Sequence, residues 1–381
     1  MANIKSVKAS GRRDVSRELP GNTPNQPPLA CAIYDRISCK FFAVIGNPPY
    51  QDETIGNNKT FAPPIYDKFI DESYEIAENV ELIHPARFLV NAGSTPKMWN
   101  KKMLSDEHFK ILHFEEDSSK IFPNTDIKGG VAVSFHSHSK IFGPIGVFTP
   151  NSKIQGILNK VIRNPNYESL STIIITSYAY HFTDALHKDY PKAEKMMSKG
   201  HAYDLKSNVF QNIPFVFADE KPNQGDYIRI LGRLNNERVY KFIRTKYVNK
   251  VSNVDKYKIF LSGAMGRGEF GETIVDPIIG YPGDGSTETF LSMGSFSSKQ
   301  EALRISKYVK TKFARCLLGI LKKTQANTPE KWKYVPLQDF TSKSDIDWTK
   351  SVHEIDLQLY KKYGLSKEEK DFIETHVKEM V

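Results

Sequence analysis

Four consecutive residues combine a carboxamide, two prolines and an aromatic ring: Asn47-Pro48-Pro49-Tyr50. The exocyclic amine of a nucleobase is a poor nucleophile because its lone pair is delocalised into the ring, so a site that alkylates it should accept hydrogen bonds from both amine protons. Asn47 offers a side-chain carbonyl for this, and Pro48 offers a backbone carbonyl on a residue without an N–H group. Tyr50 offers a flat face on which a base pulled out of a duplex can stack.

The tetrapeptide follows a short apolar run, residues 41–46, which stops at a glycine and two prolines. The run is continuous and β-rich rather than alternating, which predicts a buried strand of a parallel sheet. Open α/β sheets place their ligands in the loops at the carboxyl ends of such strands. Pro48 keeps Asn47 out of the helical region, so the carboxamide is presented from an extended backbone. A rigid turn without chemistry is the alternative interpretation.

Residues 44–51, Val-Ile-Gly-Asn-Pro-Pro-Tyr-Gln, resemble the catalytic motif of N6-adenine DNA methyltransferases, in particular the gamma-class enzymes of type II restriction-modification systems. The resemblance implies S-adenosylmethionine as the cofactor and a flipped adenine in double-stranded DNA as the acceptor. It also implies a catalytic motif made of Asn47, Pro48, Pro49 and Tyr50. The expected activity is that of a site-specific, adenine-specific DNA methyltransferase.

The chain after the motif continues with alternating elements. We expect helices over residues 61–78 and 98–109 and strands over 80–89 and 111–114. The strand over 80–89 ends in Pro-Ala-Arg-Phe, which resembles the sequence that follows the next strand in the family. His84 in this strand is interpreted as structural, because amine methylation needs no strong base before the attack.

A second motif, residues 119–124, precedes an expected strand over 129–135. In the gamma class an aromatic residue at this place packs against the flipped adenine, so the resemblance implies that Phe122 is the partner of Tyr50. Asp126 and Lys128 are expected to orient this loop or to contact phosphate.

The cofactor-binding part of the family's sheet has no counterpart in this sequence. The family's motif strand is the fourth of a doubly wound sheet, and one βαβ unit needs about 30 residues, so the roughly 40 residues before the motif strand cannot hold three strands with their helices. The Gly-rich stretch 266–271 lies far downstream and is a poor candidate for a cofactor loop. We therefore expect a partial, Rossmann-like methyltransferase sheet with an exposed apolar edge at residues 41–45, and a separate chain as the possible source of the cofactor-binding half.

Composition describes an ordinary globular chain of 381 residues with 39% hydrophobic residues. No stretch approaches the roughly 20 apolar residues of a membrane-spanning helix, and the start of the chain lacks the apolar core of a signal peptide. The three cysteines, Cys31, Cys39 and Cys316, are too few and too scattered for a disulfide framework or a metal site, so we expect no metal and a cytoplasmic location. The net charge of +9 favours a polyanionic partner.

The expected organisation has four parts: a flexible basic arm (1–35), the catalytic half of a methyltransferase domain (36–145), an α+β target-recognition domain (146–340) and a helical tail (341–381). Residues 221–258 interleave Lys and Arg with aromatic residues, a composition that suits a surface clasping a duplex. Stretches 173–183 and 210–218 are expected to be β-rich. The candidates for phosphate contact are Arg267, Lys310, Lys312 and Arg315.

Alternatives remain open at this point. Asp219-Glu220-Lys221, with Asp204 upstream, loosely fits the acidic-x-Lys group of restriction nucleases, which would make the chain part of a fused restriction endonuclease. Charged turns of this kind are common at strand ends, and Pro222 follows directly. The chain could also be a truncated or split DNA-recognition fragment without autonomous catalysis, or a remnant with neither activity.

Overall fold

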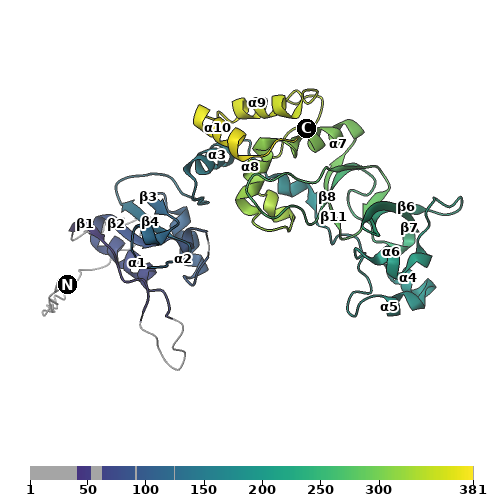
Figure 1. Cartoon of the computed structure of the whole chain (residues 1–381), viewed down its shortest axis with the longest axis horizontal. Coiled ribbons are helices and arrows are strands. Elements are labelled where there is room, and N and C mark those ends of the chain that lie inside the picture. The colour runs from purple at the N-terminus through teal and green to yellow at the C-terminus, as the bar shows by residue number, and fades with distance from the viewer. Residues whose placement is uncertain (1–40, 53–61, 91, 124, 381) are drawn as a thin grey trace, which may run out of the picture.

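The computed structural model describes residues 41–52, 62–90, 92–123 and 125–380. The basic arm expected over residues 1–35 lies outside this part, as do Cys31 and Cys39. The described chain is a mixed α/β protein with three separate sheets (Figure 1). None of its described helices is long and apolar enough to cross a membrane.

The first sheet has the strand order β1-β2-β4-β3. Its strands are β1 (Phe41–Gly46), β2 (Ala77–Pro85), β3 (Phe109–Glu115) and β4 (Val131–Ser137). β1 pairs with β2 in parallel, and β4 runs antiparallel to both β2 and β3. The carboxyl ends of β1, β2 and β3 therefore lie along one edge of the sheet, together with the amino end of β4. All four strands match expected segments, although β2 begins earlier and ends before the expected boundary at residue 89.

Two helices cover one face of this sheet, α1 (Tyr66–Ile76) and α2 (Lys97–Ser105) (Figure 1). α1 starts later than expected because two prolines precede it, and it ends where β2 begins without a loop. Phe69 of this helix is 43% exposed. The buried side chains between helices and sheet include Ile70, Val80, Leu82, Phe88 and Met103.

β1 is an edge strand of the described sheet, paired with β2 on one side only. Phe41 is 56% exposed, Phe42 83% and Ile45 76%, so the expectation of a buried strand is wrong for β1 within the described chain. The exposed apolar edge expected from the sequence is therefore present among the described residues. Such an edge offers unpaired backbone groups to another strand.

The second sheet has the order β5-β11-β8-β9 and lies in the largest core. Its strands are β5 (Ile174–Ile175), β8 (Tyr257–Ser262), β9 (Ile278–Gly280) and β11 (Phe290–Phe296). The helices around it are α3 (Ser152–Ile162), α7 (Lys299–Tyr308), α8 (Lys312–Leu321), α9 (Val352–Lys362) and α10 (Lys367–His376). Leu359 of α9 and Ile373 of α10 are fully buried in the same core as Phe313 of α8, so the helical tail packs as part of this body.

The third sheet, of order β10-β6-β7, belongs to a smaller lobe with its own core. The elements of this lobe are α4 (Asp184–Asp189), α5 (Pro191–Met196), α6 (Val209–Asn212), β6 (Tyr227–Leu234), β7 (Glu237–Arg244) and β10 (Asp284–Ser286). Asn235 and Asn236, both with positive φ, form the tight turn between β6 and β7. Figure 1 shows this lobe at the opposite end of the molecule from the first sheet, with the second sheet between them.

The prediction that residues 173–183 and 210–218 are β-rich is mostly wrong. Only Ile174 and Ile175 of the first stretch form a strand within a sheet. The second stretch contains the end of α6 and a 3₁₀ turn, Pro214–Val216. Short apolar runs fit a buried helix as well as a strand, and Pro214 cannot donate the ladder hydrogen bond that a central strand needs.

Candidate active site

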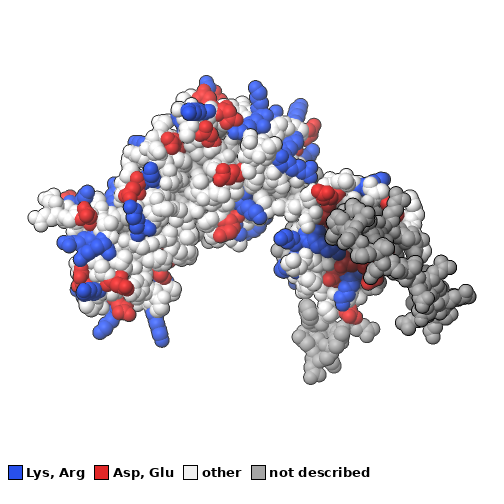
Figure 2. All heavy atoms as spheres, turned by 180° about the vertical axis from the view of Figure 1, so that it is seen from behind, with Lys and Arg blue, Asp and Glu red and all other residues white. Residues whose placement is uncertain are grey.

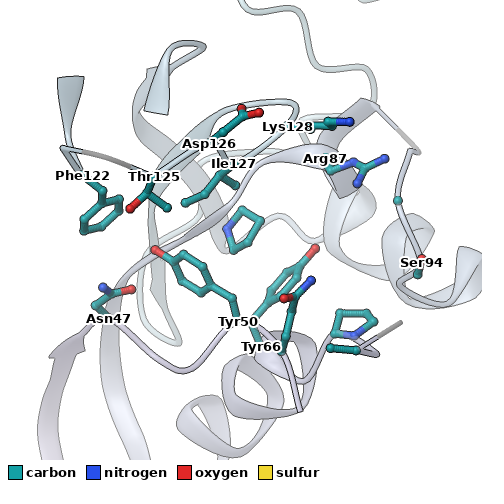
Figure 3. Close-up of a pocket in the computed structure, with 15 residues that line it drawn as sticks. Asn47, Tyr50, Tyr66, Arg87, Ser94, Phe122, Thr125, Asp126, Ile127 and Lys128 are labelled. Carbon is teal, nitrogen blue, oxygen red and sulfur yellow. The ribbon is translucent and has the colours of Figure 1, made fainter. Parts of the chain in front are cut away.

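A cavity of about 650 Å³ opens at the edge of the first sheet where the strands β1, β2 and β3 end (Figure 3). Four segments line it: the loop after β1, the stretch before and at the start of α1, the turn after β2, and the loop between β3 and β4. The lining residues are Asn47, Tyr50, Gln51, Ala62, Pro64, Tyr66, Pro85, Arg87, Gly93, Ser94, Phe122, Thr125, Asp126, Ile127 and Lys128. This is the position at which an open α/β sheet is expected to bind its ligand.

The Asn-Pro-Pro-Tyr motif forms the loop directly after β1. Asn47 and Tyr50 line the cavity, whereas the two prolines shape the backbone between them. The loop is held by main-chain hydrogen bonds to the segment before α1, with Ile65 N donating to Tyr50 O at 3.2 Å and Asp52 N donating to Pro63 O at 2.9 Å. These bonds hold the backbone at the carboxyl end of the motif, and Asn47 at its start lines the cavity.

Phe122 lies opposite Tyr50 across the cavity (Figure 3). Their ring centroids are 6.4 Å apart, and the ring planes are inclined by 73°. The Tyr50 hydroxyl is buried and has no hydrogen-bond partner among the described residues, and burial raises the pKa of this phenol to about 12. The aromatic ring, rather than the hydroxyl, therefore accounts for the contacts of Tyr50 in this structure.

The loop that carries Phe122 is organised around Ser118, a residue that the sequence did not single out. Its hydroxyl donates to Thr125 O at 2.9 Å and accepts from Ile127 N at 2.8 Å, and its carbonyl accepts from Phe122 N at 2.8 Å. Asp117 caps the short turn that follows by accepting from Ser119 N. The Asp-Ser-Ser sequence is a capping pattern from which this turn, but not the contacts made by Ser118, could have been predicted.

His84 lies behind the cavity wall and is completely buried. Its Nε2 is 2.8 Å from Ser134 Oγ, and its ring is nearly parallel to that of Tyr66. Burial lowers the pKa of His84 to about 4, so the imidazole is neutral near pH 7. These contacts agree with the structural role expected for it.

The expectation of phosphate contact is wrong for Arg315 and Lys312, because both side chains are buried in the body around the second sheet. Arg315 is only 2% exposed. Its guanidinium donates hydrogen bonds to the carbonyl oxygens of Lys310 at 3.0 Å and Glu272 at 3.1 Å. Lys312 forms a 2.6 Å ion pair with Glu374.

The other two candidates for phosphate contact differ in their surroundings. Lys310 is paired with Asp276 at 3.5 Å, and its side chain is 18% exposed. Arg267 is exposed and stays a candidate.

The Gly-rich stretch 266–271 is closed by contacts within the protein. The Glu272 carboxylate accepts hydrogen bonds from Arg267 N at 2.6 Å and Gly268 N at 3.1 Å, and it forms an ion pair with Lys322 at 2.5 Å. These backbone donors, which a cofactor phosphate or carboxylate would need, are already satisfied. The backbone N–H groups of Arg267 and Gly268 are therefore not free to bind the carboxylate of S-adenosylmethionine.

A nuclease centre also lacks support in the described part of the chain. No group of three or more His, Cys, Asp or Glu side chains there could hold a metal ion. Asp219, the first residue of the candidate acidic-x-Lys group, is paired with Lys241. Asp204 is engaged by His201 at 2.7 Å and His181 at 3.4 Å.

Sequence comparison finds a family that matches the segment containing the Asn-Pro-Pro-Tyr motif. Residues 26–122 match the family described as Eco57I restriction-modification methylase. A protein of Mycoplasma pneumoniae named as an adenine-specific methylase is 29% identical over 94 residues, which cover 24% of this chain and 22% of that protein. The expected resemblance to adenine methyltransferases of restriction-modification systems is confirmed. The match to the curated relative spans only about a fifth of its length.

Solved structures align with more of the chain but loosely. The type IIG restriction endonuclease BpuSI aligns with 82% of this chain and 49% of its own length, with 9% identity and a TM-score of 0.29. The type IIL restriction-modification enzyme MmeI in complex with DNA aligns with 88% of this chain and 56% of its own, with 10% identity and a TM-score of 0.31. Alignments at these TM-scores do not establish a shared fold.

Proposed function

We propose that the protein is a site-specific DNA adenine N6-methyltransferase of a restriction-modification system, because residues 26–122 match a restriction-modification methylase family. The acceptor is an adenine flipped out of double-stranded DNA, and S-adenosylmethionine supplies the methyl group. One observation carries this proposal: Asn47, Tyr50 and Phe122, which come from two loops far apart in sequence, line the same cavity. The cavity volume lies within the range of about 300–1,000 Å³ that small-ligand sites occupy.

The residues of the motif have separate roles in this proposal. The side-chain carbonyl of Asn47 and the backbone carbonyl of Pro48 accept hydrogen bonds from the two protons of the target amine, which orients the nitrogen and favours development of positive charge on it. Tyr50 and Phe122 hold the base by ring contacts, which compensates for stacking lost from the duplex. No general base is needed before the attack, because the amine proton becomes acidic once the nitrogen is alkylated.

The open edge of β1 favours a second candidate function. In this alternative the chain is a truncated or split fragment that recognises DNA and carries the catalytic loop but does not catalyse methyl transfer alone. β1 ends at the motif, and its outer edge has no partner strand among the described residues. A strand parallel to β1, belonging to a cofactor-binding half on another polypeptide, would cover Phe41 and Ile45 and bring the cofactor beside Asn47. Calorimetric titration with S-adenosylmethionine separates the candidates: binding supports an autonomous enzyme, and no binding with DNA binding retained supports the fragment.

DNA contact is proposed for the small lobe as well as for the cavity. Arg233 and Arg238 face each other across the β6–β7 hairpin, and both are exposed. Like charges directly opposite each other repel, and a phosphate between them would relieve this repulsion. Figure 2 shows Lys and Arg side chains distributed over both ends of the visible face rather than over one of them.

The test of the proposed function is methyl transfer from labelled S-adenosylmethionine to duplex DNA by wild type and Asn47→Ala. We expect the variant to lose transfer while its affinity for DNA stays nearly unchanged, because Asn47 contacts only the target amine. Equal loss of transfer and DNA binding would show that Asn47 is structural. A fragment that needs a partner is tested in the same way after the partner has been added.

A further inference from the structure

We propose that Arg87, supported by Lys128, forms a subsite for a phosphate attached to the target adenine nucleoside. This assignment rests on the proposed adenine site and extends it from the base to the backbone of the flipped nucleotide. Figure 3 shows Arg87 and Lys128 at one end of the cavity and Asn47 and Phe122 at the other, with Tyr50 between them. A nucleotide bound by its base at the Asn47 end would direct its phosphate towards the cationic end.

The side chain of Arg87 is held in place by two glycines with left-handed backbones. Gly93 has a φ of +86° and Gly129 a φ of +87°, a conformation that glycine adopts without strain. A Cβ atom at Gly129 would lie 2.5 Å from Arg87 Cγ, and one at Gly93 would lie 3.3 Å from Arg87 Cβ. The stem of Arg87 therefore packs against backbone where any other residue would crowd it, and this packing limits the positions of the guanidinium.

The charges at this end of the cavity have no ion-pair partner in the part of the chain that the structure describes. Neither the Arg87 guanidinium nor the Lys128 ammonium makes an ion pair or a hydrogen bond with any residue that the structure describes. Asp126 is the single acidic side chain among the described residues that line the cavity, and its carboxylate points away from Tyr50 in Figure 3. Arg87 is exposed as a residue, but its stem packs against the backbone at Gly93 and Gly129. An arginine whose stem is packed and whose guanidinium has no anionic partner among the described residues is suited to bind an oxyanion from outside the protein.

A phosphate fits this place better than the carboxylate of the cofactor. Arg87 follows β2, which lies inside the sheet, whereas the open edge available to a cofactor-binding half is on the far side of β1. The arginine and the open edge thus flank Asn47 on different sides.

The experiment compares nucleoside and nucleotide binding to the full chain by NMR titration. The probes are deoxyadenosine, its 5′- and 3′-monophosphates, and deoxycytidine as the base control. The proteins are wild type, Arg87→Gln, Arg87→Lys and, as the matched control, Lys101→Gln, which removes an exposed cation of α2 outside the cavity. S-adenosylmethionine is titrated into the same proteins.

Wild type is expected to bind one of the monophosphates about tenfold more tightly than deoxyadenosine, the gain of one charge-assisted contact. Arg87→Gln should lose this preference while still binding deoxyadenosine, Arg87→Lys should keep part of it, and Lys101→Gln should keep all of it. A phosphate preference that is absent in wild type, or that survives in Arg87→Gln, overturns the inference and leaves the adenine site intact. Equal loss of nucleoside and nucleotide binding in Arg87→Gln also overturns the inference, because Arg87 would then only maintain the structure of the cavity.

Two further outcomes distinguish other failures. If Arg87→Gln weakens binding of S-adenosylmethionine and leaves the phosphate preference unchanged, the anion at Arg87 is the cofactor carboxylate. If deoxycytidine binds as well as deoxyadenosine, or neither binds, the proposed adenine site itself is wrong and the phosphate subsite falls with it.

Discussion

The rings of Tyr50 and Phe122 meet edge to face with centroids 6.4 Å apart, although one follows β1 and the other lies in the loop between β3 and β4. Base stacking on an aromatic side chain contributes about 1–3 kcal/mol. Tyr50→Ala or Phe122→Ala should therefore lower kcat/KM for methyl transfer by about 5- to 160-fold.

The hydroxyl of Tyr50 provides an internal control for this prediction. Because it is buried without a partner among the described residues, Tyr50→Phe should keep activity and leave the free energy of unfolding unchanged or slightly higher. The measurements are steady-state kinetics and urea unfolding of the three variants. Tyr50→Phe as inactive as Tyr50→Ala would show that the hydroxyl contacts the substrate.

Because His84 is buried in its neutral form, we predict that the free energy of unfolding decreases at acidic pH. Its pKa falls from 6.5 to about 4 on folding because the imidazole is buried, so the unfolded chain binds more protons between these pH values. The contribution of the neutral imidazole is complete above pH 6.5 and is lost as the pH falls through this interval, by up to about 3 kcal/mol. Urea unfolding of wild type and His84→Gln from pH 7.5 to 4.5 measures it. The variant should be less stable at pH 7.5 but lose less stability on acidification, and parallel pH profiles would contradict the assignment.

The pair formed by Arg233 and Arg238 predicts a salt effect. If each arginine neutralises one phosphate, Arg233→Gln or Arg238→Gln should reduce the slope of log K against log salt by about 0.9, with similar loss on different DNA sequences. Fluorescence anisotropy titrations with labelled duplexes, at salt concentrations from about 50 to about 200 mM, measure this slope. Lys367→Gln on the exposed side of α10 is the control. A slope that does not change in either arginine variant would exclude the hairpin from the DNA contact.

The open edge of β1 predicts self-association of the purified chain. Exposed apolar side chains beside unpaired backbone groups favour pairing with another strand. Phe42→Lys should therefore lower the average mass seen by light scattering, because an edge lysine blocks such pairing. Met98→Lys is the matched control, since Met98 is 77% exposed but lies on a helix. A monomeric wild type, or an equal effect of both substitutions, would show that the edge is not a pairing surface.

Local patterns in the sequence predicted the strands of the first sheet because each is a short, continuous run. The pairing of Tyr50 with Phe122 was implied by the resemblance to gamma-class adenine methyltransferases and not by a local pattern. The contacts of Ser118 and the packing of Arg87 against Gly93 and Gly129 were not predictable, since they join loops whose relative positions depend on the whole sheet. Arg315 was misassigned because a charged residue on a helix normally faces solvent, whereas α8 is buried around most of its circumference.

The most direct test of the central claim is nucleoside analysis by mass spectrometry of DNA from cells that express the chain, with its partner if it needs one. We predict N6-methyldeoxyadenosine in DNA exposed to wild type and none above background with Asn47→Ala. Methylation of cytosine alone, or an adenine methylation level that Asn47→Ala leaves unchanged, would contradict the assignment of the cavity as an adenine methylation site.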